Sequence, residues 1–180
     1  MPILPIDYCP SCGSQTKLHI PEGDNRERAV CGACDTIHYQ NPKIVAGALP
    51  VWQDKILLCK RAIEPRYGTW TLPAGFMENG ETVEQGAIRE TREEAEAELV
   101  NLSIYTMLSI PRISQVYIIF RADLTGPDAF GVGTESLETA LFAEHEIPWD
   151  EISFPMIKRS LRYYFKDRER GHFGVYAEDM

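Results

Sequence analysis

The sequence predicts an α/β fold, an α/β/α sandwich with a mixed sheet, preceded by a small module that depends on four cysteines. Three observations support this prediction. Apolar segments of strand length stand on both sides of a well-marked helix that starts near residue 82, a second amphipathic helix follows over 155–167, and four of the five cysteines stand within the first 34 residues. The 180 residues suffice for one ordinary domain and one small module.

The cysteines form two Cys-x-x-Cys pairs. Cys9 and Cys12 are separated from Cys31 and Cys34 by 18 residues, which is within the spacing of a zinc site with four thiolate ligands. Two disulfides, or four unrelated thiols, are the alternatives. We favour zinc because nothing in the sequence indicates secretion. Cys59 stands in an apolar run and is expected to be a buried strand residue.

Residues 1–40 are predicted to form a zinc ribbon, because a segment this short buries too little core to fold without a metal. A turn over 20–29 is expected to join two short strands. Lys17, Arg26 and Arg28 are the only basic residues before the second cysteine pair, so we favour a structural or dimer-forming role over nucleic-acid binding.

The main domain is predicted over 41–168, and the apolar patterns give its elements in order. We expect strands over 43–52, 55–61, 70–73, 99–109, 115–124 and 137–143, and a closing helix over 155–167. The stretch 125–136 is rich in glycine, proline and acidic residues and is predicted to be a mobile loop. Residues 169–180 are expected to form a partly ordered C-terminal tail.

The central helix has a clear start and an unusual acidic face. Thr82 and Gln85 stand at capping-box spacing, so the helix should begin near Thr82 and continue past Glu94. On this helix Glu90, Glu93 and Glu94 share one face, and Glu90 and Glu94 lie about 6 Å apart along the axis. A solvated acidic face is the common explanation for such spacing, whereas a hard cation such as Mg²⁺ would compensate the repulsion.

The residues around this acidic face favour a bound cation over a solvated face. Gly75, Glu81, Arg89-Glu90 and Glu93-Glu94, with their spacing, resemble the signature of the Nudix hydrolases, which cleave a nucleoside diphosphate linked to another group. Thr91, Glu96 and Ala97 depart from that pattern. Glu96 replaces a glycine that would end the helix in a left-handed conformation, at a cost of roughly 1 kcal/mol for another residue.

The resemblance implies a role for each matching residue. Glu90 and Glu94 are the principal Mg²⁺ ligands, with Mn²⁺ as the alternative metal, and Glu93 is a further ligand or the base that deprotonates water. The carbonyl of Ala74 is a backbone ligand. Arg89 and Glu81 form a supporting ion pair that orients the glutamates. The catalytic candidates are thus Glu81, Arg89, Glu90, Glu93 and Glu94.

In some relatives the general base stands on a flexible loop, and Glu135 and Glu138 occupy such a segment here. Either residue can equally be a solvated loop acid.

The substrate is indicated less directly. A zinc ribbon before such a domain resembles the NADH pyrophosphatases, but their Ser-Gln-Pro-Trp run is missing from residues 107–112. The wider pattern is more similar to the FAD and ADP-ribose pyrophosphatases, so we expect FAD or ADP-ribose to be cleaved to two monophosphates. The candidate substrate contacts are Arg61, Trp70, Gln115 and Tyr117, of which Trp70 and Tyr117 either stack on a base or belong to the core.

The charge narrows the range of partners. A net charge of −9 and a pI near 5 argue against non-specific binding to nucleic acid or to an anionic membrane. With no apolar run long enough to cross a bilayer and no signal peptide at the amino terminus, the protein is expected to be cytoplasmic. The resemblance implies a homodimer. A non-catalytic nucleotide sensor or nucleic-acid-binding protein, and an enzyme acting on RNA ends, are the competing hypotheses.

Overall fold

The computed structural model describes residues 6–180, and these residues divide into two compact units. One unit comprises the residues up to Pro42 together with Arg112–Ser114, and the other comprises Lys43–Pro111 and Gln115–Met180. Residues 1–5 of the predicted zinc ribbon lie outside the described residues.

The first unit contains a three-stranded antiparallel sheet. Its strands are β1 (Thr16–His19), β2 (Arg28–Cys31) and β3 (Ile37–His38), in the spatial order β1-β2-β3. The connection between β1 and β2 is the predicted turn, and Gly23 within it has a φ of 82°, which a glycine adopts without strain. Among the described residues of this unit, the buried apolar side chains are those of Cys9, Pro21, Ala29, Val30 and Cys31. So small a core agrees with a fold that depends on metal.

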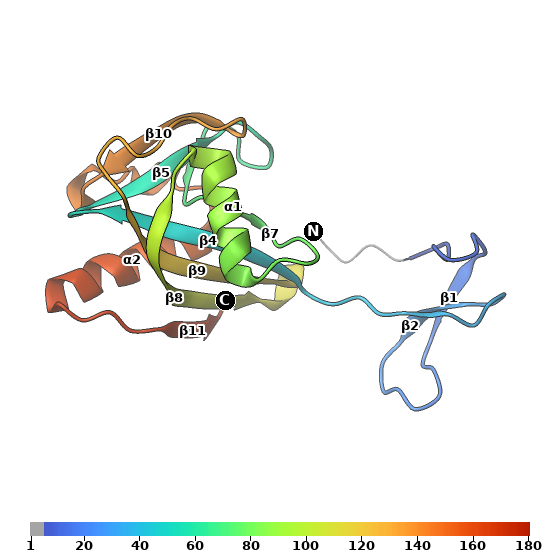
Figure 1. Cartoon of the computed structure of the whole chain (residues 1–180). Coiled ribbons are helices and arrows are strands. Elements are labelled where there is room, and N and C mark those ends of the chain that lie inside the picture. Colours follow the sequence, from blue (N-terminus) through green and yellow to red (C-terminus); the bar gives the residue numbers. More distant parts are fainter. Residues whose placement is uncertain (1–5) are drawn as a thin grey trace. The chain divides into compact units, whose positions relative to one another are not determined.

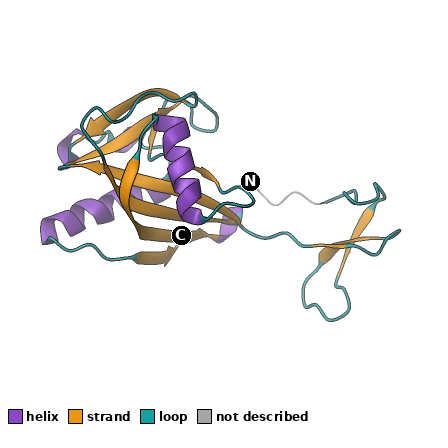
Figure 2. Cartoon of the chain, in the orientation of Figure 1, coloured by secondary structure: helices purple, strands orange, loops and turns teal. Residues whose placement is uncertain are grey.

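The second unit contains an eight-stranded mixed sheet (Figures 1 and 2). Its main path has the order β10-β5-β4-β9-β8-β11, and the short strands β6 and β7 pair with β5 and β4. The β4–β9 and β8–β11 pairs are parallel and the others are antiparallel. The strands are β4 (Lys43–Trp52), β5 (Lys55–Arg61), β6 (Trp70–Thr71), β7 (Ala74–Phe76), β8 (Leu99–Ile110), β9 (Gln115–Leu124), β10 (Ser136–Phe142) and β11 (Tyr176–Asp179).

Two α-helices cover opposite faces of this sheet, with α1 (Val83–Ala95) in front of it and α2 (Pro155–Arg170) behind it in Figure 1. On the α1 side, Ala46 of β4, Ala87 of α1 and Phe120 of β9 form a buried cluster. On the α2 side, the hydroxyls of Thr106 and Ser160 lie 2.9 Å apart. Short 3₁₀ helices η1 (Pro111–Ile113), η2 (Glu144–Glu146) and η3 (Trp149–Glu151) complete the elements. The α/β/α sandwich with a mixed sheet is confirmed.

The structure differs from the sequence prediction at the C-terminal end. The stretch predicted as a tail, 169–180, contains the last residues of α2 and the whole of β11, which pairs with β8. Buried Asp167 accepts hydrogen bonds from the hydroxyls of Tyr105 and Tyr176, and the rings of Tyr163 and Tyr176 stack 3.9 Å apart. Side-chain contacts of this kind order the segment, and a hydrophobic pattern does not reveal them.

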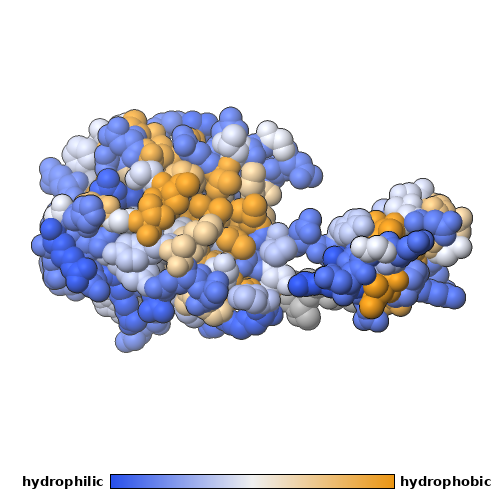
Figure 3. Space-filling model, turned by 90° about the horizontal axis from the view of Figure 1, so that it is seen from below, coloured by the Kyte–Doolittle hydropathy of each residue, from blue (hydrophilic) through white to orange (hydrophobic). Residues whose placement is uncertain are grey.

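The surface of the second unit is partly apolar on the side of β8 and β11. Figure 3, which views the molecule from below Figure 1, shows apolar side chains gathered there. Val100, Ile104 and Met107 of β8 are among the exposed apolar side chains. Among the described residues, no helix is both long and apolar enough to span a membrane.

Candidate active site

The N-terminal cap of α1 fixes where the acidic helix begins. Thr82 has an extended backbone, and its hydroxyl accepts a hydrogen bond from the N–H of Gln85 at 3.1 Å. The side chain of Gln85 accepts one in return from the N–H of Thr82, at 2.8 Å. The predicted capping box is therefore confirmed, and it determines which helical face carries the glutamates that follow.

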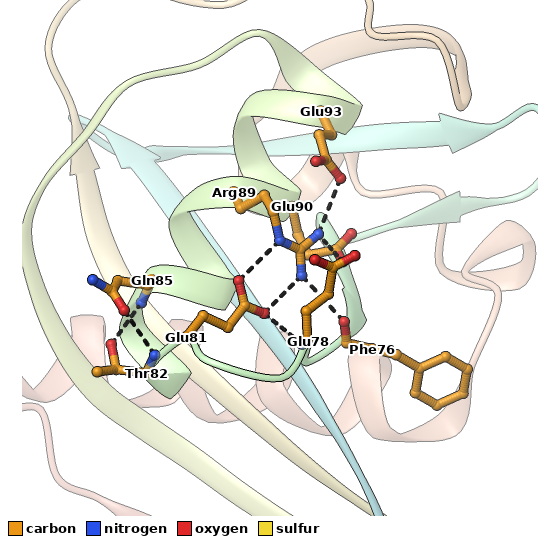
Figure 4. A network of polar contacts seen from close by, with 8 residues as sticks. All are labelled: Phe76, Glu78, Glu81, Thr82, Gln85, Arg89, Glu90 and Glu93. Carbon is orange, nitrogen blue, oxygen red and sulfur yellow. Dashed lines mark hydrogen bonds and ion pairs between the residues drawn. The ribbon is translucent and has the colours of Figure 1, made fainter.

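Arg89 is the centre of the polar network in Figure 4. Its guanidinium donates to both carboxylate oxygens of Glu81 at 3.0 and 2.8 Å, and to Glu90 and Glu93 at 2.7 and 3.1 Å. A further hydrogen bond reaches the carbonyl of Phe76 at 3.1 Å. The structure thus contains the Arg89–Glu81 pair that the resemblance implies and extends it to two of the three helix glutamates.

Glu81 is held as an anion by its neighbours. The hydrogen bonds from Arg89, followed by the one from the N–H of Glu78 at 2.7 Å, lower the pKa of Glu81 to about 2. The hydrogen bonds to Glu81, followed by the one to Glu90, raise the pKa of Arg89. Because both groups stay charged, the pair can orient Glu90 and Glu93 at any physiological pH.

The three helix glutamates differ in burial. Glu90 and Glu94 are 8% and 5% exposed, whereas the side chain of Glu93 is 54% exposed. Burial, followed by the nearby charge of Glu90, raises the pKa of Glu94 to about 8. Burial also raises the pKa of Glu90. One oxygen of Glu94, Oε2, is buried and has no hydrogen-bond partner among the described residues.

The backbone of β7 lies directly against these carboxylates. A Cβ on Gly75 would lie 2.3 Å from Oε2 of Glu90, so only glycine leaves room for that carboxylate. The backbone of Ala74 is hydrogen-bonded to Glu94. A Cβ on Gly47 of β4 would lie 2.3 Å from the Cβ of Ala74, so the β4–β7 contact that positions Ala74 also requires a glycine.

The residues fit a divalent cation. Two buried carboxylates, the unpartnered oxygen of Glu94, exposed Glu93 and the adjacent Ala74 backbone supply the oxygen ligands that Mg²⁺ and Mn²⁺ prefer. Raised pKa values, as at Glu90 and Glu94, are expected where like charges share a buried site that a cation would neutralise. When bound, such a cation would screen phosphate charge and make a coordinated water more acidic.

The two candidate loop acids are in different surroundings. The charge of Glu135 contributes to the raised pKa of both Glu90 and Glu94, and the backbone of Gly133, two residues before it, contacts the backbone of Glu94. Glu138 stands in β10 opposite Lys60, and its carboxylate forms an ion pair with that lysine at 3.5 Å. Of the two residues, the structure brings only Glu135 toward the helix glutamates.

The candidate substrate contacts also lie in different surroundings. The positive charge of Arg61 acts on both Glu94 and half-buried Tyr117, while its guanidinium donates to the carbonyl of Pro65 at 3.0 Å and lies over the ring of Phe154. Trp70 is 6% exposed and packs edge-on against Phe142, with ring centroids 4.8 Å apart, so the structure supports a core position for it. Gln115 is half-buried at the start of β9, opposite Lys43 of β4.

The four cysteines of the first unit form a second cluster. Their Sγ atoms lie within 4.8 Å of one another, with Cys9–Cys34 at 3.7 Å and Cys12–Cys31 at 3.4 Å. These distances exceed a disulfide bond of about 2.05 Å, and they match the edges of about 3.8 Å expected for four sulfurs 2.3 Å from a tetrahedral zinc ion. Hydrogen bonds from Thr36 lower the pKa of Cys34 to about 6, which favours the thiolate that zinc requires. The cysteines fit structural zinc.

Sequence reasoning missed the contacts of Gly131 and Gly133. Their N–H groups donate to the carbonyls of Ala95 and Glu94 at the end of α1. The only sequence signal is the pair of glycines separated by one residue, which a pattern analysis assigns simply to a loop.

An α/β sandwich whose helix glutamates, beside a glycine-containing strand, fit a divalent cation is typical of metal-dependent proteins, and comparison with known families identifies the family. The NUDIX domain profile matches residues 41–161, and a profile described as Nudix N-terminal matches residues 7–40. The chain belongs to the Nudix family.

Individual relatives add detail. The NAD-capped RNA hydrolase NudC of Vibrio vulnificus is 30% identical over 143 residues, covering 78% of this chain and 52% of that protein. The ADP-ribose pyrophosphatase of Methanocaldococcus jannaschii is 32% identical over 114 residues, covering 61% of this chain and 67% of that protein. The chain thus spans about half the length of the NudC relative.

A solved structure is more similar. The crystal structure of a NUDIX hydrolase from Nitrosomonas europaea has 50% sequence identity and a TM-score of 0.92, and the match covers 97% of this chain and 99% of that one. The similarity therefore extends over both units.

Proposed function

We propose that the protein is a Nudix pyrophosphohydrolase that uses Mg²⁺, or Mn²⁺, to cleave the pyrophosphate bond of a nucleoside diphosphate linked to another group. The observation that carries the proposal is the buried, unpartnered oxygen of Glu94 beside buried Glu90 and the β7 backbone. Arg89 reaches Glu90 but leaves this oxygen of Glu94 unpaired, and an unpaired buried carboxylate oxygen is costly, so a bound cation is the simplest compensation.

Each residue has a separate task in this proposal. Glu90, Glu94, the carbonyl of Ala74 and Glu93 would hold the cation, while Arg89 and Glu81 keep the carboxylates in position. The carboxylate of Glu135 accepts a proton from the attacking water as the new phosphorus–oxygen bond forms. The bond to the leaving phosphate breaks, and two monophosphates result.

We propose ADP-ribose or FAD as the substrate, with NADH or another nucleotide as the alternative. The relatives are named for compounds that contain an adenosine diphosphate, namely ADP-ribose and the NAD cap of RNA. Arg61, which lies close enough to Glu94 to act on its pKa, supplies positive charge for a phosphate, and neighbouring Tyr117 supplies an aromatic ring.

A substrate panel tests the function. The zinc-loaded protein is incubated with Mg²⁺ and then Mn²⁺ in the presence of ADP-ribose, FAD, NADH, NAD or an NAD-capped RNA oligonucleotide. We expect one compound to yield two monophosphates, and Glu94→Gln to lower kcat by more than about 100-fold, since a ligand should matter more than its supporting residues. Glu84→Gln, an exposed change on the same helix, is the control.

The panel also distinguishes the competing hypotheses. Cleavage of the capped RNA in preference to free nucleotides would favour the RNA-end enzyme. If the wild type binds ADP-ribose or FAD and cleaves nothing, the protein is a nucleotide sensor and the enzyme proposal fails.

Glu135 and Glu138 provide a matched pair for the general base. Glu135→Gln is expected to lower kcat by about 10²–10⁴-fold, whereas Glu138→Gln should leave kcat nearly unchanged because its carboxylate pairs with Lys60. Equal losses in the two variants would refute this assignment.

The proposal includes two further features, a structural role for the zinc ribbon and a homodimer. Light scattering of the purified protein measures the mass in solution, and a mass of 20.4 kDa at all concentrations would contradict the dimer.

A further inference from the structure

The loop between β9 and β10 is anchored to the end of α1. The N–H of Gly131 donates to the carbonyl of Ala95 at 2.7 Å, and the N–H of Gly133 donates to the carbonyl of Glu94 at 3.2 Å. The last carbonyls of a helix have no partner within the helix, so these two contacts complete α1. A segment that the sequence predicts to be mobile is instead attached to the helix that carries the glutamates.

Gly133 leaves less room for a side chain than Gly131 does. A Cβ at this position would lie 1.8 Å from the carbonyl oxygen of Glu93 and 2.8 Å from the carbonyl carbon of Glu94. Both atoms belong to the backbone of a helix, so they cannot rotate away as the end of a side chain can. Any side chain at residue 133 would therefore separate the loop from α1.

Gly131 differs in a way that provides a control. A Cβ there would lie 2.3 Å from Oε2 of Glu96, an atom at the far end of an exposed, flexible side chain. The carboxylate can move away, which leaves the Cβ of Glu96 at 3.2 Å, so an alanine at residue 131 requires a shift of only a few tenths of an ångström.

Beyond Gly133 the loop is also tied to the sheet. The N–H of Ser136 donates to the carbonyl of Gly133 at 3.1 Å, and the N–H of Ala62 donates to the carbonyl of Glu135 at 2.8 Å. Ser136 then pairs with Arg61 as β10 begins. Glu135 therefore stands between two anchors, one on α1 and one at the end of β5.

From this arrangement we infer that Gly133 is a positioning residue that sets where the Glu135 carboxylate stands relative to Glu90 and Glu94. The inference rests on the proposed function, in which Glu135 serves the cation site. Gly133 directly contacts the backbone of Glu93 and Glu94. The position of the loop residue Glu135 relative to the helix glutamates therefore depends on this contact.

A double-mutant cycle tests the inference. Mn²⁺ affinity, measured by the electron paramagnetic resonance of free Mn²⁺, and kcat are determined for the wild type, Gly133→Ala, Glu135→Gln and the double variant. Each single change is expected to weaken Mn²⁺ binding by up to about 10-fold and to lower kcat, and the double variant should be no worse than Glu135→Gln alone. Gly131→Ala should match the wild type.

Other results overturn the inference. If the effects of Gly133→Ala and Glu135→Gln multiply, Gly133 acts on α1 itself and not through Glu135. If Gly133→Ala equals the wild type, the close approach has no consequence for the site. Should Gly133→Ala fail to fold, a glycine inserted between Gly133 and Thr134 replaces it, and unchanged Mn²⁺ affinity in that variant would overturn the inference.

Failure of the proposed function gives a different result. In that case the wild type cleaves none of the panel, while the Mn²⁺ cycle still reports whether Gly133 and Glu135 act together.

Discussion

At the scale of single residues, the candidate site contains carboxylates held in opposite states. Glu81 is stabilised as an anion by Arg89, whereas burial disfavours the charge of Glu94. The difference comes from partners: Glu81 accepts hydrogen bonds from a guanidinium and a backbone N–H, and Oε2 of Glu94 has no described partner. Glu81 therefore has partners for its negative charge, whereas Oε2 of Glu94 is an unpaired oxygen that a cation would satisfy.

Glu81 should make stability depend on acid pH. Its pKa in the folded protein, about 2, is below the value of 4.5 for a free glutamate, so its contribution is fully present above pH 4.5 and is lost as the pH falls toward 2. In urea unfolding at a series of pH values, we expect Glu81→Gln to be less stable than the wild type at neutral pH, with the gap closing over that range.

The control for this prediction is Glu84→Gln, which removes an exposed carboxylate near the same helix start. A constant gap between Glu81→Gln and the wild type from pH 7 to pH 2 would show that the carboxylate charge is not the cause.

At the scale of elements, α1 is fixed by different means at its two ends. A capping box closes its start, and at its end Glu96 adopts a left-handed conformation with φ 49° and ψ 29°. The sequence predicts strain at this position, and the structure shows that Glu96, a non-glycine residue, does adopt a positive φ. The loop N–H groups of Gly131 and Gly133 satisfy the terminal carbonyls there.

Removing the cap should weaken the helix. Thr82→Ala is expected to lower the free energy of unfolding by about 1 kcal/mol, because the N–H of Gln85 loses its acceptor. Thr82→Ser retains an oxygen at the same place and should restore most of the loss in thermal unfolding. Equal losses for alanine and serine would contradict a capping role.

Replacing Glu96, the left-handed residue at the end of α1, with glycine should increase stability. Glu96→Gly is expected to raise the free energy of unfolding by up to about 1 kcal/mol, because glycine adopts positive φ without a Cβ penalty and the Glu96 side chain is exposed. Glu84→Gly, inside the same helix, should instead cost about 1 kcal/mol. A loss of stability in Glu96→Gly would show that the packing of the Glu96 side chain outweighs the strain.

At the scale of the whole molecule, the two units are stabilised differently. The described residues of the first unit bury few apolar side chains around four clustered sulfurs. The second unit has an extensive core on both faces of its sheet, in which Cys59 is fully buried with a raised pKa.

Zinc removal should therefore affect one unit only. A thiol reagent added to the native, zinc-loaded protein is expected to label none of the five cysteines; a chelator should expose four, and denaturant the fifth, Cys59. The main calorimetric transition of the second unit should remain after chelation. Rapid labelling of all four cysteines without a chelator would argue against bound zinc.

The sequence by itself determined the features that depend on local spacing. The capping box, the shared face of the helix glutamates, the two cysteine pairs and the bounds of β4, β5 and β9 all follow from residues near one another in the chain, where helical and strand periodicity act.

Only the tertiary structure decided which distant residues meet. It lets the charge of Glu135 act on the helix glutamates, pairs Glu138 with Lys60, buries Trp70, orders β11 beside β8, and sets Gly133 against the end of α1. These outcomes depend on strand register and on close packing between segments tens of residues apart. Neither leaves a periodic signal in the sequence.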